Sequence, residues 1–324
     1  MRRLVCSLLL VVIGTSTALA DPPSFRAGVT RIAVQDATPF DALIAYPTEA
    51  TEASIEDGPF RLLASRDAPV AAGARFPIVL FSHGGGRKPG TPLAQAGLLL
   101  HLARQGFVVV APFHPATERP FVDRPRQMHK ALDSLLADPR FSQRADPNRI
   151  AMAGFSFGGA VTLISAGAIV DLAHLSAYCH DHPDDTRACD GIATDGSWAK
   201  VPPSPKSDDV LPLKALVLLE PYGAPFAQKS LASIDLPTLI YSTSQSDLQP
   251  EGNALAVARA LPKPPQQAIV PGSHFVFVDV CSPALAALAP EPCSDPSGTD
   301  RAAVHQRFKR EISDFLRGRL SAAP

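Results

Sequence analysis

The sequence has almost no net charge, few charged residues and few cysteines. Lys and Arg number 30 against 31 Asp and Glu, so the formal net charge is −1. A chain this close to neutrality has no bulk field to attract nucleic acid or an anionic membrane surface, and neither is an expected partner. Charged residues make up 19% of the chain and hydrophobic residues 46%, which favours a compact globular body over disorder. The sequence leaves the oligomeric state open.

No apolar run at the N-terminus is long enough for a membrane anchor. Arg2 and Arg3 precede an apolar run at residues 4–13, and Ala-Leu-Ala follows at residues 18–20. A run of this length does not span a hydrocarbon core of about 30 Å. Its charged start and small residues are typical of a secretory signal, so we expect a signal peptide at residues 1–20, cleaved after Ala20. The mature protein is then periplasmic or secreted, without stable membrane insertion.

The sequence has five cysteines and lacks any Cys-x-x-Cys pair. Cys6 falls in the expected signal peptide. The other four form two close pairs in the sequence: Cys179 with Cys189, and Cys281 with Cys293. An even number in an exported chain favours disulfides, and of the three possible connectivities local pairing is the simplest. His180 and His182 beside Cys179 keep a metal site open as an alternative, but without a Cys-x-x-Cys pair we expect no metal and no cofactor.

Strand and helix patterns alternate through most of the chain. Alternating residues at 29–34 and 41–46 predict antiparallel strands, followed by a polar loop before residue 76. Apolar runs predict further strands at 76–82, 107–111, 150–153, 215–219, 238–242 and 268–270. Helical spacing or composition predicts helices at 94–105, 126–137, 158–167, 254–261 and 304–320. This order indicates an α/β protein with a mostly parallel sheet covered on both faces.

One segment interrupts this alternation. Residues 171–212 are polar, rich in Pro and Asp, and contain one of the cysteine pairs and the single tryptophan, Trp198. We interpret this segment as a small insertion over one end of the sheet. The sequence lacks internal repeats and any convincing linker, so residues 21–324 are expected to form a single domain.

The strongest chemical signal is a serine between two glycines. Gly154-Phe155-Ser156-Phe157-Gly158 matches G-x-S-x-G, with a predicted strand before it and a small-residue helix after it. Such a match occurs by chance in roughly one chain in ten of this length, so the assignment depends on the predicted strand and helix on either side. In that setting the turn is tight and strained, and the serine stands exposed at its tip as a nucleophile.

A serine hydroxyl needs a base to take its proton, and the base is oriented by an acid. The expected chain order is serine, acid, histidine. His274 follows the last predicted strand, whereas His305 lies on the closing helix, where we expect it to be solvated. For the acid we favour Asp247, in the loop after residues 238–242, which is where such folds usually present it. Glu220, at the end of the preceding strand, is the alternative acid.

The negative oxygen of a tetrahedral intermediate needs preorganised N–H donors. One is expected from Phe157, the first residue after the nucleophile, and the other from the His-Gly-Gly-Gly sequence at residues 83–86, at Gly85. The alternative for this glycine-rich loop is phosphate binding. It fails because the sequence lacks G-x-x-x-x-G-K-[ST] and no helix follows the loop.

Together these residues resemble the α/β-hydrolase superfamily over essentially the whole mature chain. Within it, the chain resembles the bacterial group of predicted dienelactone hydrolases related to platelet-activating-factor acetylhydrolase. The shared motifs are Phe-Ser-His-Gly-Gly at 81–85, Asp-Pro-Arg-Phe at 138–141, Asp-Pro-Asn-Arg-Ile at 146–150, Pro-Gly-Ser-His-Phe at 271–275 and the tail from residue 281 to 303. The resemblance implies carboxylic-ester hydrolysis by Ser156, Asp247 and His274 without metal or cofactor. True dienelactone hydrolases use a cysteine nucleophile, so the group name says little about the substrate.

The expected function is therefore that of a secreted serine carboxylic-ester hydrolase working through an acyl-enzyme on a small-molecule ester. No lipase-like amphipathic lid is recognisable, which favours short or medium acyl groups. The aromatic candidates for an apolar pocket are Phe113, His114, Phe155, Phe157, Tyr222, Phe226 and Phe275. The same triad would also serve an amidase, a peptidase or an acyltransferase, and a binding protein on a hydrolase scaffold is the alternative of a different class.

Overall fold

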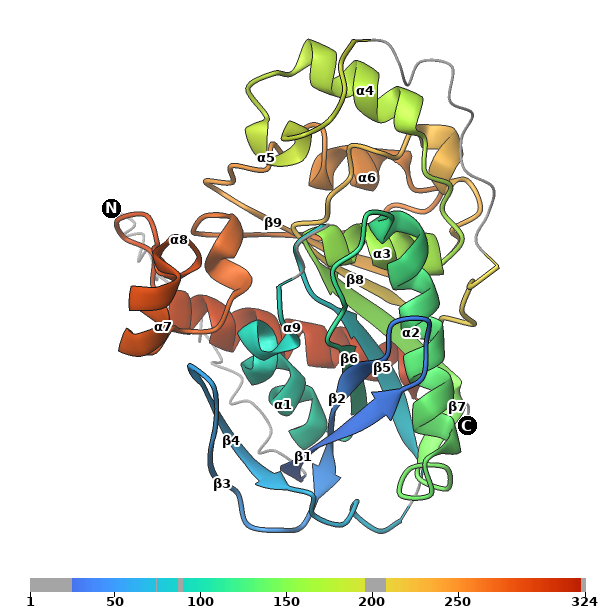
Figure 1. The fold of residues 1–324 in the computed structure, drawn as a ribbon, viewed down its shortest axis with the longest axis vertical. Helices are drawn as coiled ribbons and strands as arrows, with labels where there is room; N and C mark the ends of the chain where they lie inside the picture. Colours follow the sequence, from blue (N-terminus) through green and yellow to red (C-terminus); the bar gives the residue numbers. More distant parts are fainter. Residues whose placement is uncertain (1–24, 74, 87–89, 196–207, 322–324) are drawn as a thin grey trace, which may run out of the picture.

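The computed structural model describes residues 25–73, 75–86, 90–195 and 208–321. The expected signal peptide at residues 1–20, its cleavage site and Trp198 lie outside the described residues. The described chain forms one central sheet with helices packed on its two faces (Figure 1). In this part of the chain, no helix is long and apolar enough to cross a membrane.

The sheet has ten strands in the order β10-β9-β8-β7-β5-β6-β2-β1-β4-β3. Their bounds are β1 Arg26–Val34, β2 Phe40–Thr48, β3 Ala53–Asp57, β4 Phe60–Arg66, β5 Phe76–Ser82, β6 Val108–Pro112, β7 Ala145–Phe155, β8 Leu216–Leu219, β9 Thr238–Thr243 and β10 Gln266–Val270. Strands β5 to β10 pair in parallel, while β1 and β2 pair antiparallel and join the rest through an antiparallel β2–β6 contact. This confirms the expected mostly parallel sheet with a leading antiparallel part.

The central strands are buried on both faces because their side chains alternate between two cores. In β5, Ile78 and Leu80 belong to one core, whereas Val79 and Phe81 belong to the other. In a strand that is covered on both sides, no side chain faces water, so its sequence is a continuous apolar run.

Helices cover each face. The longer ones are α1 Ala96–Arg104, α2 Pro120–Ala137, α3 Phe157–Ser165, α4 Leu172–Asp181, α6 Ala254–Ala260 and α9 Arg301–Leu320. The short ones are α5 Thr186–Cys189, α7 Pro283–Leu288 and α8 Pro290–Cys293, with 3₁₀ turns η1 Pro92–Gln95, η2 Gln228–Leu231 and η3 His274–Phe277. Buried residues of α1 and α9 pack in one core and those of α2 and α3 in the other, so the two pairs lie on opposite faces (Figure 1).

Two expectations about the elements are corrected. The segment before residue 76 is not only a polar loop, because it contains the hairpin of β3 and β4 at the sheet edge. An edge strand such as β3 buries little and shows no apolar alternation. Helix α2 begins at Pro120 rather than at residue 126, because it continues through Pro125, a residue type that ordinarily ends a helix.

The strand order reverses direction at β5, which creates a switch point in the sheet. From β5 the chain moves to β6 on one side, then returns to β7 on the other side of β5 and continues outward through β8, β9 and β10. At such a switch point the loops after the two neighbouring strands diverge and leave a crevice. The loop at residues 83–86 leaves β5 there, and Ser156 leaves β7 there.

Both cysteine pairs form local disulfides, as expected. Cys179 and Cys189 are bonded with a Cα–Cα separation of 5.4 Å and join α4 to α5, while Cys281 and Cys293 are bonded at 5.7 Å and close the segment that contains α7 and α8. The insertion carrying α4 and α5 lies at one end of the molecule beside α6 (Figure 1).

Candidate active site

Ser156 stands at a strained turn between β7 and α3. Its φ is 55°, in the left-handed region that residues other than glycine rarely adopt. Glycines on either side are a steric requirement. A Cβ on Gly154 would lie 2.1 Å from the carbonyl oxygen of Gly158, and a Cβ on Gly158 would lie 1.9 Å from the carbonyl oxygen of Ser82. The turn therefore closes only with hydrogen in place of both side chains.

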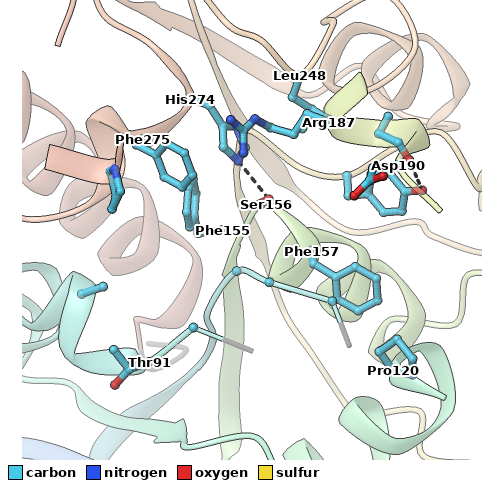
Figure 2. A pocket seen from close by; sticks show the side chains of 18 of the residues that line it. Thr91, Pro120, Phe155, Ser156, Phe157, Arg187, Asp190, Leu248, His274 and Phe275 are labelled. Carbon is cyan, nitrogen blue, oxygen red and sulfur yellow. Dashed lines mark hydrogen bonds between the residues drawn. The ribbon is translucent and has the colours of Figure 1, made fainter. Parts of the chain in front are cut away.

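The structure brings Ser156 and His274 together although they are far apart in the sequence. The Oγ of Ser156 lies 3.0 Å from the Nε2 of His274 (Figure 2). His274 begins η3 directly after β10 and its side chain is buried, with the ring 4.9 Å from that of Phe155. A base at this distance can take the serine proton, and a buried ring keeps one orientation.

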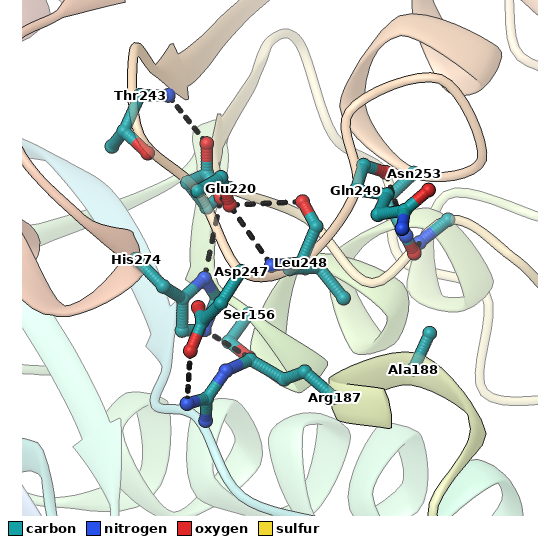
Figure 3. A network of polar contacts seen from close by, with 12 residues as sticks. Ser156, Arg187, Ala188, Glu220, Thr243, Asp247, Leu248, Gln249, Asn253 and His274 are labelled. Carbon is teal, nitrogen blue, oxygen red and sulfur yellow. Dashed lines mark hydrogen bonds and ion pairs between the residues drawn. The ribbon is translucent and has the colours of Figure 1, made fainter. Parts of the chain in front are cut away.

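The carboxylate beside His274 belongs to Glu220, not to Asp247. Glu220 Oε2 lies 3.3 Å from the Nδ1 of His274 (Figure 3). Glu220 directly follows β8, has a φ of 45° and is 1% exposed. Its two carboxylate oxygens also accept hydrogen bonds from the backbone N–H of Thr243 and the hydroxyl of Ser246. Two hydrogen bonds, one from β9 and one from the loop that follows it, thus hold the strained Glu220 in one position against His274.

The expectation that Asp247 orients the histidine is wrong in its geometry. Asp247 makes an ion pair with Arg187 of α5 and its side chain is 52% exposed. Burial raises the pKa of Asp247, but the hydrogen bond and the charge of Arg187 outweigh burial and hold this pKa below its usual range. The loop after β9 turns Ser246 inward to Glu220 and so turns the next residue, Asp247, outward to the insertion.

The two expected oxyanion donors lie beside the serine. Gly85 and Phe157 both line the cavity that contains Ser156. Phe157 is the first residue of α3, where a backbone N–H has no acceptor within its own helix. Gly85 has a φ of 80°, which glycine adopts without strain. A Cβ on the preceding Gly84 would lie 3.3 Å from the Cβ of Ser156, so this loop runs directly against Ser156.

The site opens into a cavity of about 1040 Å³, at the upper end of the size range of small-molecule pockets. Apolar and aromatic side chains dominate its walls around Ser156 (Figure 2). The aromatic residues are Phe60, Phe121, Phe155, Phe157, Tyr222 and Phe275. Three other expected pocket residues lie elsewhere: Phe113 stacks under Arg31, His114 joins a buried polar network, and Phe226 lies in the core.

Several wall residues could not be expected from the sequence. The insertion contributes Arg187, Ala188 and Asp190, and the segment of α7 and α8 contributes Leu285 and Pro292. Arg187 reaches across this opening, since it pairs with Glu291 as well as with Asp247 and lies 4.7 Å over the ring of Phe275. The disulfide bonds are the only sequence signal that these irregular segments hold a fixed position.

The remaining histidines fall outside the site. His174, His180 and His182 are exposed on the insertion. His305 is not solvated as expected but 5% exposed, with its Nε2 2.8 Å from the carbonyl oxygen of Val276. Among the described residues, no group of three or more His, Cys, Asp or Glu side chains could hold a metal ion.

Comparison with known proteins adds a family and a fold. A family model described as alpha/beta hydrolase fold matches residues 79–256, more than half of the 324-residue chain. Among solved structures, the chain is similar to one from a structural analysis of two fungal esterases from Rhizomucor miehei and their substrate specificity. That similarity has a TM-score of 0.51 at 14% identity and covers 91% of this chain and 84% of the other. At this identity it shows a shared fold. A search of curated proteins finds no match.

Proposed function

The chain belongs to the alpha/beta hydrolase fold family, and on that premise we propose that it is a serine carboxylic-ester hydrolase. The observation that carries the proposal is the line from Ser156 Oγ to His274 Nε2, 3.0 Å, and from His274 Nδ1 to Glu220 Oε2, 3.3 Å, at the wall of an apolar cavity. Nucleophile, base and acid occur in the chain order of this fold, with Glu220 in the role that we expected for Asp247.

In the proposed reaction the ester carbonyl lies beside Ser156 with its oxygen toward the N–H groups of Phe157 and Gly85. His274 takes the serine proton as the Oγ–carbon bond forms, and Glu220 stabilises the resulting imidazolium. The imidazolium then protonates the leaving alcohol as the carbon–oxygen ester bond breaks. Water attacks the acyl-enzyme by the same route in reverse, which releases the acid and restores the serine hydroxyl.

The cavity supports a small-molecule ester with a short or medium acyl group. Its volume of about 1040 Å³ admits a drug-sized molecule, and its walls carry mostly apolar side chains. The motifs shared with predicted dienelactone hydrolases and platelet-activating-factor acetylhydrolase support an ester over an amide, and we propose membership of that group on those motifs.

We also propose that the protein works outside the cytoplasm after removal of residues 1–20. Two disulfides, Cys179–Cys189 and Cys281–Cys293, support this because such bonds persist in oxidising compartments. The secreted or periplasmic protein should begin at Asp21, and an N-terminal sequence that still contains residues 1–20 would reject the proposal.

Ser156→Ala tests the activity. It should lower kcat for p-nitrophenyl butyrate by about 10⁶-fold, the loss seen when a triad serine is removed, and it should abolish labelling by a fluorophosphonate. Ser165→Ala is the matched control, because Ser165 is also buried on α3 but lies nine residues beyond Ser156. Wild-type turnover in Ser156→Ala would reject the nucleophile. Faster turnover of the corresponding anilide than of the ester would favour an amidase, and an unlabelled wild type would favour a non-catalytic scaffold.

A further inference from the structure

A cation lies buried behind the candidate oxyanion hole. Arg124, on α2, is 0% exposed. Among the described residues it makes no ion pair with a carboxylate, and its Nε finds no hydrogen-bond acceptor. Its neighbours Asp123 and Arg126 on the same helix pair with each other, and also with Arg119 and Asp36 respectively. Within the described ranges, Arg124 is therefore a fully desolvated charge whose hydrogen-bond partners are neutral.

Such a residue is costly for the fold. Burying a charge without a counter-charge is unfavourable unless hydrogen bonds and local dipoles compensate it. Burial lowers the pKa of Arg124 to about 9, which still leaves the guanidinium charged at neutral pH. An apolar side chain at this position would make the fold more stable, so packing alone does not account for the cation.

Arg124 donates hydrogen bonds to two carbonyl oxygens of the glycine-rich loop. Nη1 donates to the carbonyl oxygen of His83 at 3.1 Å, and Nη2 donates to the carbonyl oxygen of Gly86 at 3.0 Å. These two carbonyls lie at the two ends of the loop whose middle contains Gly84 and Gly85. A rigid planar fork that holds both ends fixes the peptide planes between them.

The same guanidinium contacts the other half of the oxyanion hole. Its Cζ lies 5.1 Å from the centre of the Phe157 ring, a cation–π distance. Phe157 begins α3 and supplies the second expected N–H donor. One side chain therefore touches the loop after β5 and the helix after β7, the two elements that must stay in register for both N–H groups to point at one oxygen.

We infer that Arg124 is a positioning residue for the oxyanion hole, which holds the loop at residues 83–86 against the start of α3. This inference deepens the proposed ester hydrolysis and rests on it. Arg124 does not touch the substrate. It orients the Gly85 and Phe157 donors through His83, Gly86 and the Phe157 ring, and its charge lies behind both donors in a region without solvent. The donors gain most from this placement when negative charge develops on the carbonyl oxygen, so the effect belongs to the transition state.

Arg124→Met and Arg124→Lys test the inference with p-nitrophenyl butyrate. Loss of one oxyanion donor typically lowers kcat by about 10²–10³-fold, and misplacing donors should cost part of that. We expect kcat to fall about 30–100-fold in Arg124→Met with KM within about threefold of wild type. Arg124→Lys keeps the charge but replaces the rigid planar fork by a single nitrogen on a flexible stem, so its kcat should lie between those of Arg124→Met and the wild type. Affinity for a trifluoromethyl ketone, whose serine adduct carries an oxyanion, should fall in parallel with kcat/KM.

Arg149→Met is the control for a purely structural role. Arg149 pairs with Asp146 and donates to the carbonyl oxygens of Leu320 and Arg75, at the far end of β7 from Ser156. It should lower the melting temperature and leave kcat and inhibitor affinity unchanged. If Arg124→Met is unfolded at the assay temperature, Arg124→Lys carries the test through the same kcat-against-KM comparison.

The outcomes separate the two proposals. If the wild type does not hydrolyse esters, the proposed function fails, and the positioning role fails with it. If the wild type is active and a folded Arg124 variant keeps kcat and ketone affinity within about threefold, only the positioning role fails. A kcat loss that Arg149→Met reproduces at equal melting temperature would assign the effect to stability and overturn the inference.

Discussion

Two carboxylates lie near His274, and their side chains make opposite connections. Glu220 is buried and bonded to His274 Nδ1, whereas Asp247 is half-exposed and bonded to Arg187. Only the first can hold the imidazole in the tautomer that accepts a serine proton. The carboxylate of Asp247 instead links the loop after β9 to Arg187 of the insertion.

Glu220→Gln and Asp247→Asn should therefore differ sharply. Replacing the triad acid by its amide lowered kcat by about 10⁴-fold in a serine protease, and we expect a loss of about 10³–10⁴-fold for Glu220→Gln. Asp247→Asn should change kcat by less than about threefold, because its carboxylate is only one of two that pair with Arg187. Steady-state kinetics on one ester measures both, and the reverse order of losses would return the acid to Asp247.

The positions of Ser156 and His274 could be predicted because each directly follows a strand, and strand ends lie at one edge of a parallel sheet. The acid could not, since Glu220 and Asp247 also follow neighbouring strands and both reach that edge. The choice depends on which way each side chain turns. Ser246 and Arg187 decide this by contacts between distant parts of the chain, and no local pattern encodes these contacts.

At the scale of elements, the turn between β7 and α3 depends on the absence of side chains. A Cβ at position 158 would lie 1.9 Å from the backbone oxygen of Ser82 on β5, so the strand and the helix would have to move apart. Backbone atoms on a central strand have little freedom to move. The cost should appear in both folding and activity, because the same turn carries Ser156.

Gly158→Ala should lower the free energy of unfolding by more than about 3 kcal/mol or prevent folding, in the range of severe strain or overpacking. The matched control is Gly318→Ala on α9, where an added Cβ meets nothing within 4 Å. There alanine should stabilise the helix by up to about 1 kcal/mol. Urea unfolding of both variants measures the contrast, and equal effects at the two positions would contradict it.

Several elements that bury little apolar surface were not expected from the sequence. The buried strands β5, β6, β8 and β9 were expected close to their observed bounds because continuous apolar runs mark them, whereas β7 begins at Ala145, five residues before the expected strand at 150–153. Strand β3, at the edge, and the short helices α5, α7 and α8 have no such pattern. Their positions depend on pairing with β4, on disulfides and on ion pairs such as that of Arg187 with Glu291.

For the whole molecule, two fully buried histidines link stability to pH. His83, the first residue of the loop at residues 83–86, and His114 lie with ring centres 5.0 Å apart. Burial, followed by the nearby charge of Arg124, lowers the pKa of His83 to about 3 and holds the pKa of His114 well below its usual range. His83 therefore stays neutral in the folded state over most of the acid range, and His114 is neutral in the folded state at pH values where a free histidine is protonated. In the unfolded chain a histidine takes up a proton near pH 6.5.

Stability should consequently fall as the pH drops from about 6.5, well above the range in which carboxylates are protonated. Between about pH 6.5 and 4 the unfolded state binds more protons than the folded state, so each neutral histidine removes up to about 1.4 kcal/mol of stability per pH unit. Carboxylates with lowered pKa, such as Asp36 beside Arg126, add to the loss only below about pH 4.

His114→Gln should make the pH dependence of the unfolding free energy between pH 6.5 and 5 shallower, by about the slope that one neutral histidine contributes. Ile312→Val, a core change on α9 without a titrating group, should shift the curve downward with its slope intact. Urea unfolding at half-unit pH intervals measures these slopes, and equal slopes in the wild type and His114→Gln would show that His114 is protonated in the folded protein.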